Sequence, residues 1–537
     1  MFRVGADCNP GRPRSTVAPG NILVSIRPAC DRVAALHALV IGAAMLTGCA
    51  TVRPQADFEQ TTTLISQRTG AVEAYDPSTE ERVEQQVAAM LEDGLTIQEA
   101  VGVALLNNRG FQAAFQDIGV SRADVVQSSL FANPSLAMLL QLPEGGGRSK
   151  LSVGFAQQIV GLWQIPIRKR IAEKQLERAV LEVARRAVEL AADVRVKCFR
   201  VLSLEQAKAI ATANVQLVEE SLKLAQRRVD AGEASQLDLN LVRGASLDAK
   251  LNLLDVERDQ GRARIELARA LGFSRSDRSW TLNDGVPDAD AVAVRDADIL
   301  ATALTGRLDA QAAALAVQEA DEELKRQVRS VFPDVALGIE AERPDRRALP
   351  GRNILADTAR ASVANGGLTA PDIQSRAQRN LERRQIVDAL VGPSINITLP
   401  IWDQNQAQIA KARFKAEQRR KEYEDLLDSI AQQVQEALVA ARSAQEKVRF
   451  YREQAVPQAE VNVEAARRAY GGGEQSILVL IDAEESLITL RRESLDATLD
   501  FAVAMTELER AVGGKLPEAA EEPEKHEARD GSTRGNN

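Results

Sequence analysis

Two short stretches decide how this chain is interpreted: Arg228-Val-Asp-Ala-Gly-Glu-Ala-Ser235 and Arg468-Ala-Tyr-Gly-Gly-Gly-Glu-Gln-Ser476. In each stretch a glycine is followed three residues later by a serine, and the glycines Gly232 and Gly473 are 241 residues apart. Glycine accepts the left-handed backbone that ends a helix, and serine caps a helix that begins just after it. Each stretch therefore predicts a reversal between two helices, and their similarity predicts an internal duplication.

Other pairs of positions support the duplication and show where its halves differ in length. Pro134 and Pro333 are 199 residues apart, whereas Trp163 and Trp402 are 239 residues apart. The offset increases by 40 residues between these markers. The second half therefore carries an insertion of that size, which we place at residues 342–391.

The duplication divides the chain into a signal region, an N-terminal segment, two repeats with a connection between them, and a tail. Each repeat is expected to contain a helical pattern (about 96–130 and about 299–330), two strands, a long helix, a turn and a second helix. The predicted divisions, in the same order, are residues 1–48, 49–95, 96–272 and 299–513 with the connection 273–298, and 514–537. We expect the tail to be disordered, because it is polar and rich in glutamate.

Four runs of alternating apolar and polar residues predict half-buried strands. They are residues 135–142, 150–156, 334–340 and 394–401. A soluble sandwich would bury the apolar face against another sheet, whereas a membrane barrel would turn that face to lipid. A barrel leaves no unpaired strand edge in lipid, and four strands cannot close alone. The barrel alternative therefore requires oligomerisation, and three chains would supply twelve strands.

Two segments are long enough to cross a periplasm as helices. Residues 166–230 contain no internal proline, and residues 403–470 contain only Pro457 among positions that break a helix. At 1.5 Å per residue these helices would be about 98 and about 100 Å long. Their apolar residues recur with heptad spacing, which predicts coiled-coil packing. A solvated coiled-coil rod without a passage would show the same pattern.

The composition excludes several classes of function. The net charge of −9 argues against a nucleic-acid partner. The only histidines, His37 and His526, lie near the two ends, so the body has no histidine for catalysis or for a metal site. No phosphate-binding loop is present. We therefore predict no enzyme, no catalytic residue, no metal and no cofactor other than lipid, and we expect Cys198 to be a packed hydrophobic residue.

The N-terminal region is interpreted as an export signal. An apolar run at residues 33–48 is too short for a stable membrane span. It ends in Leu46-Thr-Gly-Cys49, which resembles a bacterial lipobox, and this resemblance implies a lipid on Cys49. Ala50, rather than aspartate, follows the cysteine, which by the same analogy implies the outer membrane. The region is long for a signal, so we expect the true start downstream of Met1.

Together these features resemble the TolC-like outer-membrane efflux family. The family's turn pattern is matched by Gly473, Ser476, the apolar residues 477–481 and Asp482-Ala-Glu484. The first half matches less well, because Asn240 and Leu241 replace the usual Asp-Ala neighbourhood. The resemblance covers residues 96–513.

The resemblance implies a mainly α-helical homotrimer in the outer membrane of a Gram-negative bacterium, lipid-anchored and extending into the periplasm. Long antiparallel coiled-coil helices would form an α-barrel tunnel, and four strands per chain would form a shared 12-stranded barrel. The turns would contact a periplasmic membrane-fusion adaptor, which makes Gly232, Ser235, Gly473 and Ser476 the docking candidates. The channel would be passive and driven by an inner-membrane pump, with a resistance–nodulation–division pump expected first.

Several alternatives stay open at this stage. Acidic residues near the turns could form a gating ring or simply a solvated face; they are Asp230, Glu219, Glu220, Glu460 and Glu464. Arginines of the insertion could pair with lipopolysaccharide phosphates, or the insertion could be a plain extracellular loop. The chain could also be the exit duct of a type I secretion system, or a periplasmic scaffold lipoprotein without a pore. The cargo could be a drug, a heavy metal or a protein.

Overall fold

The computed structural model describes residues 50–142, 147–273, 280–287, 296–344, 346–347, 363–366 and 389–516. From Val52 onward these residues belong to one unit. The predicted lipid site Cys49, most of the predicted insertion and the tail from residue 517 lie outside the described residues. So do residues 143–146 of the expected first hairpin turn.

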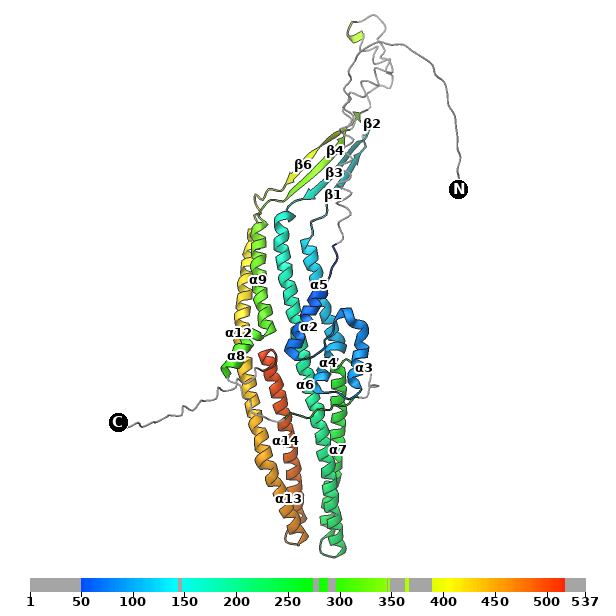
Figure 1. Ribbon diagram of the computed structural model, residues 1–537, viewed down its shortest axis with the longest axis vertical. Coiled ribbons are helices and arrows are strands. Elements are labelled where there is room, and N and C mark those ends of the chain that lie inside the picture. Colours follow the sequence, from blue (N-terminus) through cyan, green and yellow to red (C-terminus); the bar gives the residue numbers. More distant parts are fainter. Residues whose placement is uncertain are drawn as a thin grey trace, which may run out of the picture. The chain divides into compact units, whose positions relative to one another are not determined.

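Four strands form one antiparallel sheet in the order β1-β3-β4-β6 (Figure 1). Each half of the chain supplies one hairpin, and the pairing of β3 with β4 joins the halves. The strands are β1 (Ser135–Gln141), β3 (Lys150–Gln158), β4 (Val335–Arg343) and β6 (Leu390–Ile397). A short ladder of β2 (Gly147–Arg148) with β5 (Arg346–Arg347) extends beyond them. The predicted insertion, residues 342–391, overlaps the end of β4 and the start of β6 and otherwise lies between these two paired strands.

The register of the sheet gathers the apolar residues on one face. Leu136 lies opposite Phe155, and Phe155 lies opposite Ile339 on the next strand. Because opposed residues of neighbouring strands share a face, this apolar face runs across all four strands. Nothing in the described chain covers it: Leu136 is 69% exposed and Ile339 is 57% exposed. The sheet therefore does not form the dry core that a soluble sandwich requires.

The fourth strand was predicted too late in the sequence. It spans Leu390–Ile397, whereas the alternation had predicted residues 394–401. Its pairing with β4 ends where Ile397 meets Val335. Strand β4 begins at Val335, so the ladder has no further pair beyond Ile397. The apolar residues Leu399 and Ile401 therefore lie beyond the strand, although they continue its period.

The helices form most of the rest of the chain. The long ones are α5 (Arg109–Ser129), α6 (Gly161–Asp230), α7 (Gln236–Ala270), α9 (Leu308–Arg329), α12 (Gln406–Phe450), α13 (Val456–Gly471) and α14 (Ile477–Val512). The short ones are α2 (Gln55–Thr69), the 3-10 helix Pro77–Arg82, α3 (Val83–Leu91), α4 (Ile97–Asn107) and α8 (Asp296–Gly306). The first predicted long helix is confirmed as α6, which begins five residues earlier than expected. Within the described residues, no helix combines the length and the apolar character that a membrane span needs.

The second predicted long helix is interrupted once. A π-helical turn, Tyr451–Ala455, separates α12 from α13. It lies directly before Pro457, whose missing N–H removes one backbone bond of the preceding turn and whose ring crowds the carbonyl four residues earlier. A local π turn absorbs that mismatch while the helix axis continues.

Each of the two predicted helical patterns is in fact a pair of helices. Asn108 separates α4 from α5, and Arg307 separates α8 from α9, both in an extended conformation. The Asn108 side chain donates to the Ala270 carbonyl at the end of α7 (3.0 Å). The Arg307 side chain donates to the Ala511 carbonyl at the end of α14 (3.2 Å). These partners keep the offsets of the duplication, 199 and 241, so the same junction is built twice.

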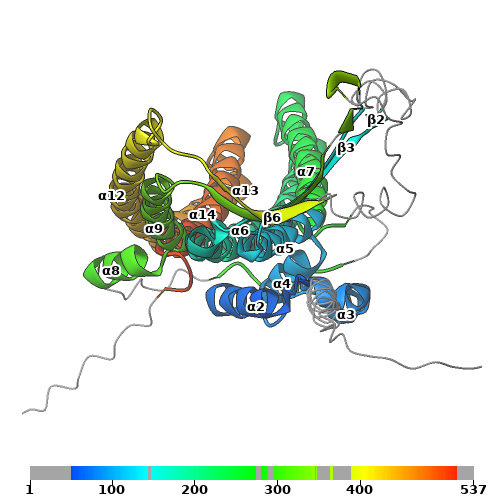
Figure 2. The same cartoon turned by 90° about the horizontal axis from the view of Figure 1, so that it is seen from above.

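Helix α6 has two different long faces. Val180, Ala184 and Ala187 are buried in one cluster with residues of α4 and α5. The short helices α2, α3, α4 and α8 lie on one side of the layer of long helices (Figure 2). Glu182 follows the buried Val180 by two residues, and Arg185 precedes the buried Ala187 by two residues. A step of two residues turns about 200° around a helix, so both charged residues face the opposite side of α6.

Candidate functional site

The first reversal has the predicted geometry. Gly232 has φ 77°, and its neighbours Glu233 and Ala234 donate backbone bonds to the Arg228 carbonyl (2.8 and 3.2 Å). Ser235 then caps α7: its hydroxyl accepts from the backbone of Asp238 (3.1 Å), and the Asp238 carboxylate accepts from the backbone of Ser235 (3.0 Å). This reciprocal pair is a capping box, which fixes where α7 begins.

The second reversal repeats the backbone but not the cap. Gly473 has φ 78°, and Glu474 donates to the Ala469 carbonyl (2.9 Å). Ser476 precedes α14 at the cap position, but its side chain makes no cap hydrogen bond. The expectation that both serines cap is thus met by Ser235 alone. Position 479, which corresponds to Asp238, is a valine and cannot complete a capping box.

An arginine connects the two reversals. The Arg228 guanidinium donates to the backbone carbonyl of Tyr470 and lies over the Tyr470 ring, 4.7 Å from its centroid. The Tyr470 side chain is buried among apolar residues of both helical hairpins. A hydrogen bond from a charged donor and a cation–π contact reinforce each other here. The ends of α6 and α13 are therefore held together within one chain.

A buried carboxylate forms a second connection nearby. Glu484 of α14 is 3% exposed and accepts a hydrogen bond from Ser221 of α6 (2.8 Å). Arg467 of α13 lies 3.7 Å from Glu484 and 3.6 Å from Glu220. Burial raises the pKa of Glu484, although Ser221 and Arg467 oppose that shift. The network joins three helices just beyond the two turns.

Each candidate gating acid has a polar partner within the chain. Glu219 pairs with Lys250 (3.0 Å), Glu460 with Arg491 (2.7 Å) and Glu464 with Arg468 (3.8 Å). Glu220 pairs with Arg467, and Asp230 accepts from Gln226 (2.9 Å). Partners of opposite charge reduce the repulsion that a ring of acids would need. The gating role of these acids stays a prediction.

The structure tests the prediction for Cys198 but not the one for Cys49. Cys49 lies outside the described residues, and its lipidation stays a prediction. Cys198 is fully buried in the core of α6, and burial raises its pKa to about 12. A thiol with that pKa has almost no nucleophilic thiolate at neutral pH. Its interpretation as a packed hydrophobic residue is confirmed.

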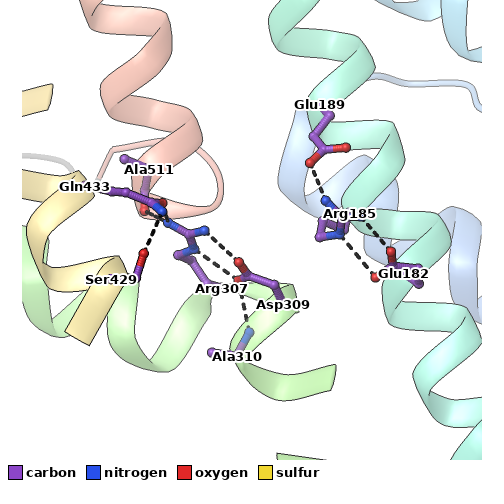
Figure 3. A network of polar contacts seen from close by, with 9 residues as sticks. All are labelled: Glu182, Arg185, Glu189, Arg307, Asp309, Ala310, Ser429, Gln433 and Ala511. Atoms are coloured by element: carbon purple, nitrogen blue, oxygen red, sulfur yellow. Dashed lines mark hydrogen bonds and ion pairs between the residues drawn. The ribbon is translucent and has the colours of Figure 1, made fainter. Parts of the chain in front are cut away.

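A hollow of about 620 Å³ is lined by residues of α6, α12, the start of α9 and the end of α14. On one side Arg307 pairs with Asp309 (2.6 Å) and donates to Gln433 (2.7 Å); on the other side Arg185 of α6 pairs with Glu182 (2.6 Å) and also with Glu189 (Figure 3). These arginines already have acidic partners in the chain. The hollow therefore offers a charged, internally compensated surface on the face of α6 away from α4.

Sequence reasoning missed Arg228, Tyr470, Ser221 and Arg467. The duplication could have singled out two of them. Tyr470 corresponds to Val229 and Arg467 to Gln226 at the offset of 241, so each breaks the repeat. Residues that differ between otherwise matching turns are candidates for contacts between those turns. The contacts themselves depend on how the hairpins pack.

Comparison with known proteins agrees with this geometry. A family model described as "Outer membrane efflux protein" matches residues 100–273 and 299–514. The cobalt-zinc-cadmium resistance protein CzcC of Cupriavidus metallidurans is 24% identical over 420 residues, which cover 78% of this chain and 90% of CzcC.

Solved structures show the same fold. The chain resembles CusC with a TM-score of 0.63 and 17% identity, covering 78% of this chain and 92% of CusC. It resembles the outer membrane protein VceC of Vibrio cholerae with a TM-score of 0.58 and 16% identity, covering 78% and 96% of the two chains. The family model spans most of both repeats, and the protein belongs to the outer membrane efflux protein family.

Proposed function

We propose that three copies of this protein form a passive channel across the outer membrane and the periplasm. The observation that carries the proposal is the open four-stranded sheet, whose apolar face is uncovered in the single chain. Strands β1 and β6 are its edges and each pairs on one side only among the described strands. Unpaired edges are not tolerated in hydrocarbon, so the sheet must close with other copies. Three copies give a shared 12-stranded barrel.

The long helices would continue the barrel as a tunnel. Helix α6 has 70 residues and would extend about 105 Å. Of its predicted stripe, Val180, Val183, Ala187 and Val194 are buried, whereas Leu190 is only partly buried. The exposed leucines Leu247, Leu251 and Leu254 of α7 lack a covering element in the single chain, which suits contact with a second copy.

The reversals would meet a periplasmic adaptor. Gly232, Ser235, Gly473 and Ser476 lie at the ends of the two helical hairpins, where both chain reversals are exposed. The channel has no energy source of its own, so a pump in the inner membrane, of the resistance–nodulation–division type, would drive transport. The relative CzcC is named for resistance to cobalt, zinc and cadmium. We propose that the pump selects the cargo, because the described residues hold no cluster of three metal-binding side chains.

A lipid on Cys49 would anchor the chain to the outer membrane. Residues 55–69 form α2, which is fixed to α5 by the pair of Asp57 with Arg122 (2.6 Å). An anchor placed just before α2 would therefore be connected to the rigid helical part by only a few residues. Mass spectrometry of the mature N-terminus tests this point, and an unmodified Cys49 would remove it.

Planar-bilayer recording of the purified, detergent-solubilised protein, together with its oligomeric mass, tests the proposal as a whole. We expect a trimer that conducts ions after insertion. A monomer that stays in water without detergent and does not conduct would contradict the channel. A trimer that conducts, but exports only a protein from a reconstituted system, would favour a type I exit duct instead.

A further inference from the structure

Exposed aromatic side chains mark the level at which the sheet gives way to the helices. Phe131 and Phe332 precede β1 and β4 by a few residues, and Trp402 follows β6. They are 54%, 63% and 88% exposed. Aromatic residues at both rims of a membrane barrel lie among the lipid headgroups. Under the proposed function, this level therefore lies in the periplasmic leaflet of the outer membrane.

Two arginines near this level differ from those about two turns further along α12. Farther down, Arg420 of α12 pairs with Asp321 of α9 (3.0 Å), and Arg419 pairs with Glu422 (2.6 Å). Arg329, the last residue of α9, and Arg413, in the second turn of α12, are exposed. Neither side chain makes an ion pair or a hydrogen bond with a described residue. At the end of α9 and near the start of α12, two guanidinium groups therefore lack an acceptor among the described residues.

Arg329 and Arg413 share one face of the α9–α12 pair. Arg413 precedes Arg420 by seven residues, which returns to the same side of α12. Arg329 follows Asp321, the partner of Arg420, by eight residues on α9, about two turns along the same side. The start of α12 lies against the end of α9, because Asn405 donates to Ser330 (2.5 Å) and to the Gln327 carbonyl (2.8 Å).

That face is the outer one of the helical layer. Arg419 lines a hollow together with Arg178 and Glu182 of α6, which lie opposite the stripe that packs on α4. Lys411 and Lys415 precede Arg419 by eight and four residues and so lie toward its side of α12. Arg413 is two residues from each of them and faces away. It therefore lies on the side that carries the short helices (Figure 2).

We propose that Arg329 and Arg413 bind the headgroup of an anionic phospholipid, such as phosphatidylglycerol, in the periplasmic leaflet. This inference rests on the proposed channel and names a partner of its outer surface. Guanidinium groups match the paired oxygens of a phosphate. Both arginines are exposed, and Arg329 lies only three residues before the aromatic Phe332, so acyl chains could extend from the headgroup toward the apolar sheet. A lipid would thereby supply the acceptors that these two side chains do not find among the described residues.

The test compares two double variants of the full-length protein in detergent. Native mass spectrometry measures binding of dioctanoyl phosphatidylglycerol and of the zwitterionic dioctanoyl phosphatidylcholine. Each cation near a membrane surface changes the affinity for anionic lipid roughly fivefold. Arg329→Gln with Arg413→Gln should therefore reduce the preference for phosphatidylglycerol roughly 25-fold. Lys411→Gln with Lys415→Gln removes the same charge at the same level of α12 and should leave the preference unchanged.

Several outcomes overturn the inference. They are no preference in the unmutated protein, an unchanged preference in the arginine variant, or an equal loss in both variants. Displacement of the lipid by excess inorganic phosphate would mean an anion site without lipid selectivity and would also overturn it. Oligomeric mass and conductance in neutral lipid are measured on the same samples. Conducting trimers without the preference refute only this inference, whereas absent trimers or absent conductance refute the channel.

Discussion

Substitution of Arg228 by alanine is expected to loosen the contact between the two helical reversals. Arg228 donates to the Tyr470 carbonyl, lies over the Tyr470 ring and has a side chain that is only 15% exposed. It also lies 3.8 Å from Glu233. Among the described contacts, Arg228 is the one charged residue that joins the two turns by both a hydrogen bond and a cation–π contact.

The size of the effect follows from these contacts. A hydrogen bond from a charged donor contributes about 1.5–3 kcal/mol, and a partly buried cation–π contact about 0.5–2 kcal/mol. The Nε atom of Arg228 is buried without a hydrogen-bond partner, and its removal offsets part of the loss. We expect a net change of about 2 kcal/mol per chain, which increases the population of separated turns about 30-fold.

Single-channel recording measures this change. If the turns restrict the periplasmic mouth, Arg228→Ala should raise the conductance or the open fraction. Arg227→Ala is the matched control, because Arg227 is exposed and donates only within its own helix, to the Lys223 carbonyl. Identical conductance of both variants and of the unmutated protein would refute the role of Arg228 at the mouth.

Three further outcomes are expected. Burial raises the pKa of Cys198 to about 12, so iodoacetamide at neutral pH should label Cys198 at least 1000-fold more slowly in the folded protein than after unfolding. Peptide mapping measures the labelling. Rapid labelling of the folded protein would contradict the assigned burial. Asp57→Asn should leave Arg122 without its charged partner and destabilise the attachment of α2 by about 2–3 kcal/mol. Limited proteolysis would detect this change as faster cleavage of α2. An unchanged cleavage rate would show that the pair does not hold α2. Burial raises the pKa of Glu484 above its ordinary 4.5, so the folded state binds the proton more tightly and the stability of the fold should decrease as the pH rises through that raised value. Glu484→Gln should flatten this pH dependence in melting curves recorded between pH 4 and pH 8. An equally steep dependence in the variant would exclude Glu484 as its source.

The sequence by itself determined the duplication and the order of elements in each half. Gly232 and Gly473 adopt the left-handed backbone that their residue type predicted. The alternating runs form strands, and the uninterrupted segment before Asp230 forms one helix. These features are local: backbone freedom, side-chain period and the absence of proline act within a few residues. The family resemblance was therefore visible in residues that are close together in the chain.

Only the tertiary structure decided which distant residues meet. The break at Arg307 has no strong local signal, and its reason is the Ala511 carbonyl that its side chain reaches. Position 397 ends the last strand because its partner strand begins at Val335, not because the alternation stops there. Contacts such as Arg228 with Tyr470 join residues more than 240 positions apart. Sequence period fixes which face of an element is apolar, but packing fixes what that face and its polar neighbours touch.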